Sequence, residues 1–351
     1  MRCPMTGARL DPLGDDFPSP DVLRWLGPHA AGRRWRALQG AGGFSGARFW
    51  RGESVGMLAT DRKPRDLCLR AWPPQHPDDA RLDRIHRLLE LAASLPFVPV
   101  PYRGQDGRSW CVADGTRFEC TDWMPGEAWD PESSTPLDPL RLAAAFRAVG
   151  RLHRAWRPER IERAIAPAVR ERFDLLRRWS EQDQGALIAV ARSDRSLPLR
   201  QTGLALLDRL ASRIDQARRR LAPWLLRPLP IRPCVRDLHA AHLLFVGTEV
   251  TGIVDFGALR DDTIATDLGR LAGSLVEDQA DGWQIAATAY AETSGESEPG
   301  IWEAARDLEF VGLVLGLANW LRWLWLDRRT FDDLPSVERR IRRRIARLDR
   351  V

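Results

Sequence analysis

Asp237, His242 and Asp255 are the residues of this sequence whose types and spacing could do chemistry. The stretch between them reads as a β-hairpin, because two short apolar runs, 243–246 and 250–254, flank a turn that contains a glycine. A hairpin brings its two ends together, so we expect the three side chains to converge. Two carboxylates and one further ligand can hold Mg²⁺ on nucleotide phosphates and orient an incoming hydroxyl.

This spacing is similar to that of a known family. His242 stands five residues after Asp237, and Asp255-Phe256-Gly257 follows the hairpin. The stretch resembles the catalytic core of the aminoglycoside phosphotransferase and choline-kinase-like family, whose motif is His-Gly-Asp with a later Asn. This chain has Val235-Arg236-Asp237 and His242 at those positions. Either aspartate alone would be read as a turn or loop residue, and the pair around a hairpin carries the resemblance.

The resemblance spans about residues 35–330 and implies a fold class. It implies an α+β, bilobal protein-kinase-like fold with a small β-rich N-lobe and a larger, mostly helical C-lobe. The expected organisation is a flexible N-terminal tail at 1–20, the N-lobe at 21–124 and the C-lobe at 125–351, with the catalytic hairpin at 234–257.

A glycine-rich turn lies between the expected strands 35–38 and 47–51. Glycines let backbone N–H groups approach anionic oxygens without a side-chain clash. Gly42, Gly43 and Ser45 are therefore the candidates for covering ATP phosphates, and a plain glycine hairpin is the alternative.

The expected strand 66–72 alternates in polarity and carries Arg70. Lys63 is the only lysine, and it lies outside any Gly-Lys-Ser/Thr sequence, which excludes a Walker P-loop. The family has a phosphate-binding lysine on this strand, so the resemblance implies that Arg70 replaces it; a surface arginine is the alternative. The family also pairs that lysine with a glutamate of the next helix, expected here over 78–95, where Glu90 is the only glutamate.

The segment after the N-lobe strands would connect the lobes. The resemblance implies that the backbone from Asp122 to Met124 reads the adenine edge, although Pro125 and Gly126 also fit an ordinary loop. Downstream, the sequence is mostly helical and rich in arginine. The last apolar stripe, over 337–350, fits a closing helix or, as the runner-up, a membrane-surface or partner helix.

The resemblance implies ATP as phosphate donor and Mg²⁺ as metal, with Asp255 and His242 as metal ligands and Asp237 as the group that accepts or orients the acceptor's proton.

Imidazole suits Mn²⁺ or Zn²⁺ better than Mg²⁺. His242 could therefore change the metal preference, donate to phosphate or mark a weakened enzyme. Arg236 could lower the pKa of Asp237 or turn away from it.

Three functional hypotheses follow. The first is a small-molecule kinase that transfers the γ-phosphate of ATP to a hydroxyl of an aminoglycoside-, amino-alcohol- or sugar-like acceptor. The second is a kinase-like pseudoenzyme that binds nucleotide or a partner without turnover, and the third is an unrelated α+β protein with a chance motif. Acidic residues downstream of the hairpin fit a cationic acceptor or simply a solvated surface: Asp261, Asp262, Glu277, Asp278 and Asp281.

Composition narrows the class of protein. The 351 residues are 44% hydrophobic with a formal net charge of +5, as in an ordinary globular protein. The sequence has no apolar run long enough to span a membrane, no secretory signal and no CxxC spacing among its five cysteines, so we expect a cytoplasmic protein. Arginine-rich helix faces without interleaved aromatic residues do not predict a nucleic-acid partner.

Overall fold

The chain forms two compact units in this computed structural model, which describes residues 17–38, 46–55, 65–74, 76–130, 137–331 and 333–351. Unit 1 is Met1–Gly126 together with Thr251–Gly257. Unit 2 is Glu127–Val250 together with Ala258–Val351. The short segment that ends in Asp255-Phe256-Gly257 therefore belongs to unit 1, while Asp237 and His242 belong to unit 2.

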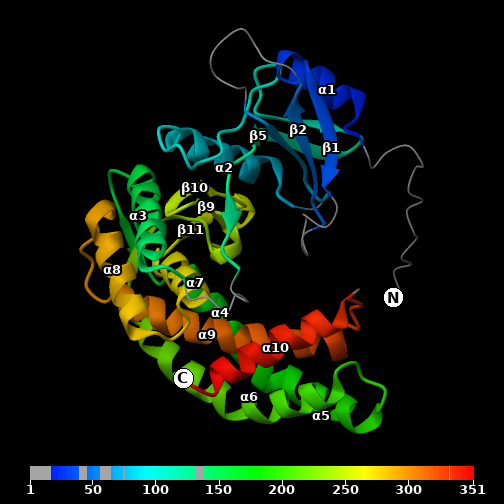
Figure 1. The fold of residues 1–351 in the computed structure, drawn as a ribbon. Coiled ribbons are helices and arrows are strands. Elements are labelled where there is room, and N and C mark those ends of the chain that lie inside the picture. Colours follow the sequence, from blue (N-terminus) through cyan, green and yellow to red (C-terminus); the bar gives the residue numbers. More distant parts are fainter. Residues whose placement is uncertain (1–16, 39–45, 56–64, 75, 131–136, 332) are drawn as a thin grey trace. The chain divides into compact units, whose positions relative to one another are not determined.

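Unit 1 is built on an antiparallel five-stranded sheet in the order β1-β2-β3-β5-β4. Its strands are β1 Arg33–Leu38, β2 Arg48–Ser54, β3 Leu67–Ala71, β4 Trp110–Ala113 and β5 Thr116–Asp122. Its helices are α1 Pro20–Leu26, η1 Gly27–His29 and α2 Asp79–Leu91, and Figure 1 shows them in blue and cyan with the sheet. The expected strands and helix of this part of the sequence are thus present.

The alternation of β3 explains which side chains form the core of unit 1. Leu67 and Leu69 are fully buried and pack with Trp50 of β2, while Arg70 points to the opposite face, as a two-residue period requires. The helix α2 begins where the sequence predicts, because the Asp78 carboxylate accepts a hydrogen bond from the Arg81 N–H at 2.8 Å.

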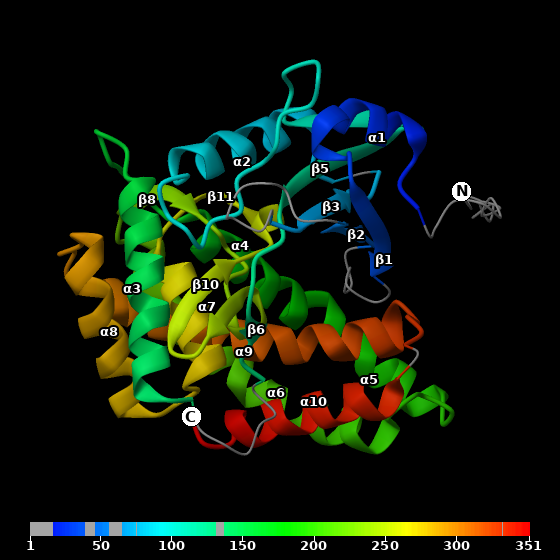
Figure 2. The same cartoon turned by 45° about the horizontal axis from the view of Figure 1, so that its top comes forward.

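Unit 2 is mostly helical, and Figure 2 shows α3 beside α8, and α9 with α6. Its helices are α3 Pro139–Ala155, α4 Pro167–Arg178, η2 Trp179–Asp183, α5 Gln184–Ser193, α6 Arg200–Leu221, η3 Ala222–Leu225, η4 Ala240–His242, η5 Phe256–Ala258 (which begins in unit 1), α7 Ala265–Leu275, α8 Ala280–Ser294, α9 Ile301–Leu321, η6 Arg322–Leu326 and α10 Leu334–Leu348. Two three-stranded sheets, ordered β10-β9-β6 and β11-β8-β7, complete the fold. Their strands are β6 Glu127–Ala128, β7 Glu162–Ala164, β8 Leu229–Cys234, β9 Leu243–Val246, β10 Glu249–Ile253 and β11 Arg260–Asp262.

The C-terminal helix α10 closes unit 2. Val337, Ile341 and Leu348 are buried, and the helix packs on α9 and α6. Arg347 donates to Asp278 at 3.0 Å and to Glu309 at 2.7 Å. These contacts support the closing-helix interpretation of this arginine-rich stripe.

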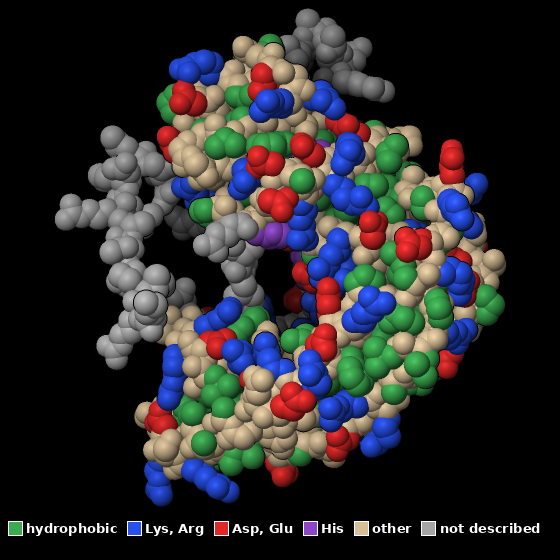
Figure 3. Space-filling model, turned by 180° about the vertical axis from the view of Figure 1, so that it is seen from behind, with side chains coloured by type: hydrophobic (Ala, Val, Ile, Leu, Met, Phe, Trp, Pro, Cys, Tyr) green, Lys and Arg blue, Asp and Glu red, His purple; other side chains and the backbone are tan. Residues whose placement is uncertain are grey.

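Charged side chains of both signs cover the face of the molecule drawn in Figure 3, where blue and red groups are interspersed rather than gathered by sign. Such mixing is typical of a solvated surface. Among the described residues, no helix is both long and apolar enough to cross a membrane.

Two leucines of α2 provide a matched test of the unit 1 core. Leu89 is 4% exposed and Leu91 is 66% exposed. We expect Leu89→Ala to lower the free energy of unfolding by about 2–5 kcal/mol, because it leaves a cavity. Leu91→Ala should change it by less than about 0.5 kcal/mol. Urea unfolding followed by tryptophan fluorescence measures both, and equal effects would contradict this packing.

Candidate functional site

Arg70 and Asp255 meet within unit 1. Arg70 lies on β3, and its Nη1 is 3.2 Å from Oδ1 of Asp255. The Arg70 side chain is 9% exposed and that of Asp255 is 42% exposed. Because the Asp255 carboxylate is accessible, it can exchange Arg70 for another partner. The pair brings together the residue predicted to grip phosphate and one residue predicted to bind metal.

Aromatic rings hold the Arg70 guanidinium. Its Cζ lies 3.4 Å from the ring centroid of Trp72 and 5.2 Å from that of Phe49 on β2. Arginine is suited to this place because its planar guanidinium stacks on aromatic faces, whereas a lysine ammonium is a compact point charge. The stacking fixes the cation beside Asp255, so Arg70 is not the surface arginine that the sequence left as an alternative.

A buried acid completes this cluster, and sequence reasoning missed it. Glu119 of β5 has Oε1 4.0 Å from the Arg70 guanidinium, while its Oε2 lies 2.6 Å from Nε2 of His86 on α2. Glu90, expected to pair with Arg70, instead pairs with Arg103 at 2.5 Å. The expectation for Glu90 was therefore wrong, because α2 presents His86 rather than Glu90 toward β5. The register that places Glu119 opposite Arg70 could not be read from the sequence.

The Asp-Phe-Gly segment has an unusual backbone. Asp255 has φ of +61°, a left-handed conformation that a non-glycine residue seldom adopts. Arg81 donates to the carbonyl of Gly257 at 2.9 Å. A Cβ at Gly257 would lie 3.1 Å from the Trp72 ring and 3.3 Å from the Asp255 carboxylate. A glycine is thus what allows the chain to pass so close to both groups.

The adenine-edge candidates lie at the end of β5. The Asp122 carboxylate accepts from Arg65 and from the Tyr102 hydroxyl, both at 2.7 Å, and the N–H of Trp123 donates to the Asp66 carbonyl at 2.8 Å. Met124 is buried. The role of Asp122 and Met124 stays a prediction, and the phosphate-covering candidates Gly42, Gly43 and Ser45 lie outside the described residues.

In unit 2, a buried carboxylate holds the loop that carries Asp237. Asp267 of α7 is fully buried and accepts hydrogen bonds from the N–H groups of Val235 at 2.7 Å and Arg236 at 2.6 Å. Its Oδ2 also lies 3.1 Å from Nε2 of His153. Asp267 therefore braces the loop that carries Asp237.

Arg236 turns away from Asp237. Its guanidinium pairs with the buried carboxylate of Asp262 and, at 2.6 Å, with Glu171 of α4. Its φ of +71° is the left-handed conformation that glycine adopts without strain. The glycine of the family motif suits that backbone, and here the ion pairs hold an arginine in it. Of the two alternatives for Arg236, the structure supports the second.

The charges that act on Asp237 come from its other neighbours. Nη2 of Arg270 on α7 donates to Oδ1 of Asp237 at 3.1 Å. Burial acts to raise the pKa of the Asp237 carboxyl, but the charge and hydrogen bond of Arg270, together with the nearby His239 and His242 side chains, more than offset it, so the pKa lies below its ordinary value. Asp237 is therefore held as a carboxylate, the form that can accept a proton.

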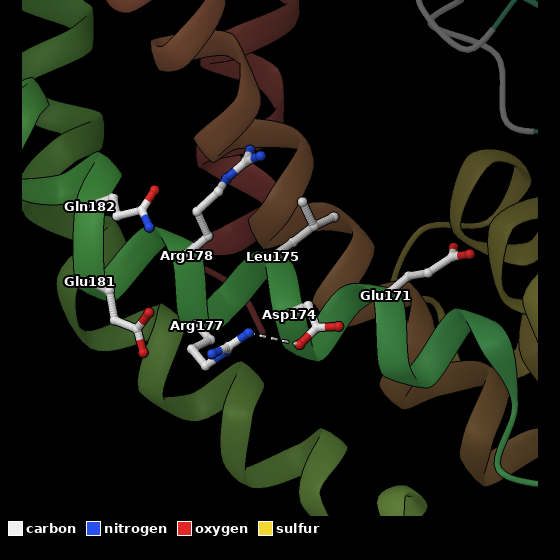
Figure 4. Close-up of a pocket in the computed structure, with 7 residues that line it drawn as sticks. All are labelled: Glu171, Asp174, Leu175, Arg177, Arg178, Glu181 and Gln182. Carbon is white, nitrogen blue, oxygen red and sulfur yellow. Dashed lines mark hydrogen bonds and ion pairs between the residues drawn. The ribbon is translucent and has the colours of Figure 1, made fainter.

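Asp237 and His242 lie together in unit 2, where Nδ1 of His242 is 2.8 Å from the Asp237 carbonyl oxygen. Asp255 belongs to unit 1, so the expected convergence of all three stays a prediction. A separate hollow in unit 2 is lined by residues of α4 and η2 (Figure 4). Glu171 of this hollow also holds Arg236, and the other lining residues are Asp174, Leu175, Arg177, Arg178, Glu181 and Gln182.

Most of the acids considered for a cationic acceptor already have cationic partners. Asp262 pairs with Arg236. Glu277 accepts from Arg343 at 2.9 Å, and Asp278 from Arg347 at 3.0 Å. These three carboxylates are structural ion-pair partners, so they offer little support for an amine-bearing acceptor.

Comparisons with known proteins show the family and the fold of this chain. The sequence model described as the phosphotransferase enzyme family matches residues 36–308, and no curated protein matches the chain. An aminoglycoside phosphotransferase from Alicyclobacillus acidocaldarius is 13% identical, with 98% of this chain and 95% of that one covered and a TM-score of 0.60. Spectinomycin phosphotransferase in complex with ADP and spectinomycin is 13% identical, with 88% of each chain covered and a TM-score of 0.59.

A choline/ethanolamine kinase family protein from Mesorhizobium loti is 20% identical, with 93% of this chain and 94% of that one covered and a TM-score of 0.55. At such identities the likeness is one of fold. The α+β, protein-kinase-like fold expected from the sequence is thus confirmed.

The Asp267 brace gives the first test of this site. We expect Asp267→Asn to destabilise the protein by about 1–3 kcal/mol. The Val235 and Arg236 N–H groups donate to different oxygens of Asp267, and in asparagine one of these oxygens becomes an NH2 group that cannot accept. Asp208→Asn, at an exposed position of α6, is the matched control. Thermal unfolding compares them, and an unchanged Tm for Asp267→Asn would refute the bracing role.

Arg270 gives a test of the electrostatics. Arg270→Leu removes a positive charge and a hydrogen bond that favour the Asp237 carboxylate, while the burial that opposes it remains. The pKa of Asp237 should therefore rise, and its protonation should move to higher pH. Carbon-13 NMR of labelled aspartate carboxyls, with Asp237→Asn for assignment, measures the change. A pKa that stays fixed or falls would show that Arg270 does not set it.

Proposed function

The chain belongs to the phosphotransferase enzyme family, and we propose that it transfers the γ-phosphate of ATP to a hydroxyl of a small molecule. The observation that carries the proposal is the pairing of Arg70 with Asp255 in unit 1, on the strand and the Asp-Phe-Gly segment where the resemblance places the phosphate and metal contacts. The presence of ADP with the spectinomycin enzyme and of AMP-PNP and Ca²⁺ with amicoumacin kinase hAmiN supports a nucleotide as donor.

Arg70 supplies positive charge for the phosphates. Its guanidinium is permanently charged and can bind two phosphate oxygens at once. The Trp72 stack keeps it in place when Asp255 changes partners. Gly42, Gly43 and Ser45 are proposed to cover the phosphates with their backbone N–H groups.

The proposed metal ligands are Asp255 and His242. The Asp255 carboxylate is part-exposed and offers the oxygen that Mg²⁺ prefers. The His242 imidazole makes Mn²⁺ an alternative. When bound, the ion would neutralise phosphate charge that this chain's own cations leave unbalanced.

Asp237 is proposed to act on the acceptor. Its carboxylate orients the acceptor hydroxyl and takes its proton as the hydroxyl oxygen bonds to the γ-phosphorus and the bond to the departing ADP oxygen breaks. A carboxylate with a lowered pKa is a weak base. Its contribution is therefore mainly the positioning of the hydroxyl, which suits a reaction that depends on alignment and charge neutralisation. Asp122 and Met124 are proposed to contact the adenine edge.

The acceptor is proposed to be a hydroxyl-bearing aminoglycoside-, amino-alcohol- or sugar-like molecule. Spectinomycin and amicoumacin are the small molecules present with two of the similar structures. Because Glu277 and Asp278 are committed to arginines of α10, a screen should include neutral polyols as well as amines.

Nucleotide binding tests the proposal directly. We expect calorimetry to show ATP binding that needs Mg²⁺ or Mn²⁺ and that Asp255→Ala weakens at least about tenfold, because a metal ligand is lost. Asp114→Ala is a matched control, since Asp114 is an exposed aspartate of unit 1 that also has a positive φ, of +48°.

Asp237→Asn should keep nucleotide binding and lose turnover. A folded wild-type protein that binds no ATP would overturn the proposal, and metal-independent binding without turnover would indicate a pseudoenzyme.

A further inference from the structure

Asp237, His239 and His242 form a cluster of metal-ligand types in unit 2. One ligand atom from each lies within 4.8 Å of the others, and among the described residues this is the one such group of three or more. The sequence resemblance assigns a role to Asp237 and to His242 but none to His239. The three follow one another closely in the chain, so local geometry decides how their side chains are arranged.

A short turn brings the two imidazoles together. Ala240–His242 is the 3₁₀ turn η4, with His239 as the residue before it. His239 itself has an extended backbone, and the turn follows directly after it. The His239 and His242 rings have centroids 3.9 Å apart and planes inclined by 36°. The two rings are therefore close neighbours.

The turn is anchored to the rest of unit 2. The Ala240 N–H donates to the Ser274 hydroxyl of α7 at 2.9 Å, and the His242 N–H donates to the His239 carbonyl at 2.8 Å. Leu238 and Ala240 are buried on either side of His239. The backbone that carries the ligands is therefore ordered before any ion arrives, which reduces the entropy lost on binding.

The tautomer of His242 suits metal binding. Its Nδ1 is 2.8 Å from the carbonyl oxygen of Asp237, and a carbonyl can only accept, so Nδ1 carries the proton. A neutral ring then has its lone pair on Nε2. Histidines that bind metals generally donate their other ring nitrogen to a carbonyl or carboxylate in this way.

We propose that Asp237, His239 and His242 form a binding site for a transition-metal ion such as Zn²⁺. Such an ion differs in its preferred ligands from the Mg²⁺ that accompanies a nucleotide. Two imidazole nitrogens and a carboxylate oxygen are a ligand set that Zn²⁺ accepts, usually with a fourth ligand such as water. Mg²⁺ prefers oxygen ligands throughout. The three side chains are part-exposed, and one ligand atom of each already lies within 4.8 Å of the other two.

The positive charge of Arg270 opposes metal binding at this site. The proposal therefore predicts the direction in which metal affinity changes when Arg270 is replaced. Its guanidinium bonds to one oxygen of Asp237 at 3.1 Å, so an arriving cation meets both a repelling charge and an occupied ligand. Replacing Arg270 with an uncharged residue should strengthen metal binding, whereas a role of the cluster in structure alone predicts no such gain.

The site would also regulate the reaction, and this consequence rests on the proposed function. A metal-bound Asp237 cannot take the acceptor's proton. Zn²⁺ should therefore suppress phosphotransfer, and a chelator should restore it.

The experiment is a titration of the full-length protein with Zn²⁺ alone, without nucleotide, by calorimetry and by competition with a zinc-sensitive dye. We expect one Zn²⁺ per chain, with binding weakened at least about tenfold in His239→Ala and in His242→Ala. His29→Ala is the control: His29 lies in unit 1 with its ring against Tyr102, and its loss should leave Zn²⁺ binding unchanged. Excess Mg²⁺ should not displace the ion.

Two further measurements keep the proposal falsifiable if an alanine variant fails to fold. Wild-type protein loaded with Co²⁺ should show visible absorption bands typical of nitrogen and oxygen ligands at low coordination number, and Arg270→Leu should bind Zn²⁺ several-fold more tightly. Absence of Zn²⁺ binding by the wild type, or wild-type affinity in folded His239→Ala, would overturn the site. Because no nucleotide is present, this result is independent of whether the protein binds ATP.

Discussion

The loop of unit 2 that carries Asp237 depends on one buried group, the carboxylate of Asp267. A buried carboxylate is costly unless hydrogen bonds surround it, and here the N–H groups of Val235 and Arg236 supply two of them. His153 of α3 supplies a third contact, and its other ring nitrogen lies 2.9 Å from the Tyr290 hydroxyl of α8. The loop therefore cannot shift without stripping partners from a charge that has no access to water. This constraint holds the backbone just before Asp237 in place. It therefore helps to position the Asp237 carboxylate, which is proposed to receive the acceptor's proton.

The charges around Arg236, beside Asp237, accommodate its left-handed backbone. A left-handed residue with a side chain carries a cost of about 1–2 kcal/mol. The Arg236 guanidinium offsets it by reaching the buried Asp262 carboxylate, which also accepts from the Ala168 N–H at 3.0 Å. Arg236 thus joins the loop to α4 rather than acting on its neighbour. The charge of Asp237 is governed instead by Arg270 and the two histidines.

Periodic features of the site could be predicted from sequence, and long-range pairings could not. The alternation over 66–72 correctly gave β3 and the face of Arg70, because a strand's period of two is a local property. Likewise, two apolar runs around a glycine turn correctly indicated β9 and β10.

Glu90 was misassigned because the choice between Glu90 and His86 depends on how α2 rotates against β5. Glu119 was missed for a similar reason: the register of β3 and β5 is set by the whole core. Downstream of the N-lobe, where the sequence reads as mostly helical, the chain also forms the short strand β7.

Arg70 of β3 lies in surroundings that suit an arginine. Its Cζ lies 3.4 Å from the Trp72 ring centroid, and a planar guanidinium gains more from an aromatic face than a lysine ammonium would. Phe49 lies directly opposite Arg70 in the register of β2 and β3 and contributes a second aromatic face. Glu119 then balances a charge that burial would otherwise penalise. The aromatic faces and the acid come from β2, β5 and the residue just after β3 rather than from α2. Arg70 is therefore held in place without a glutamate of that helix.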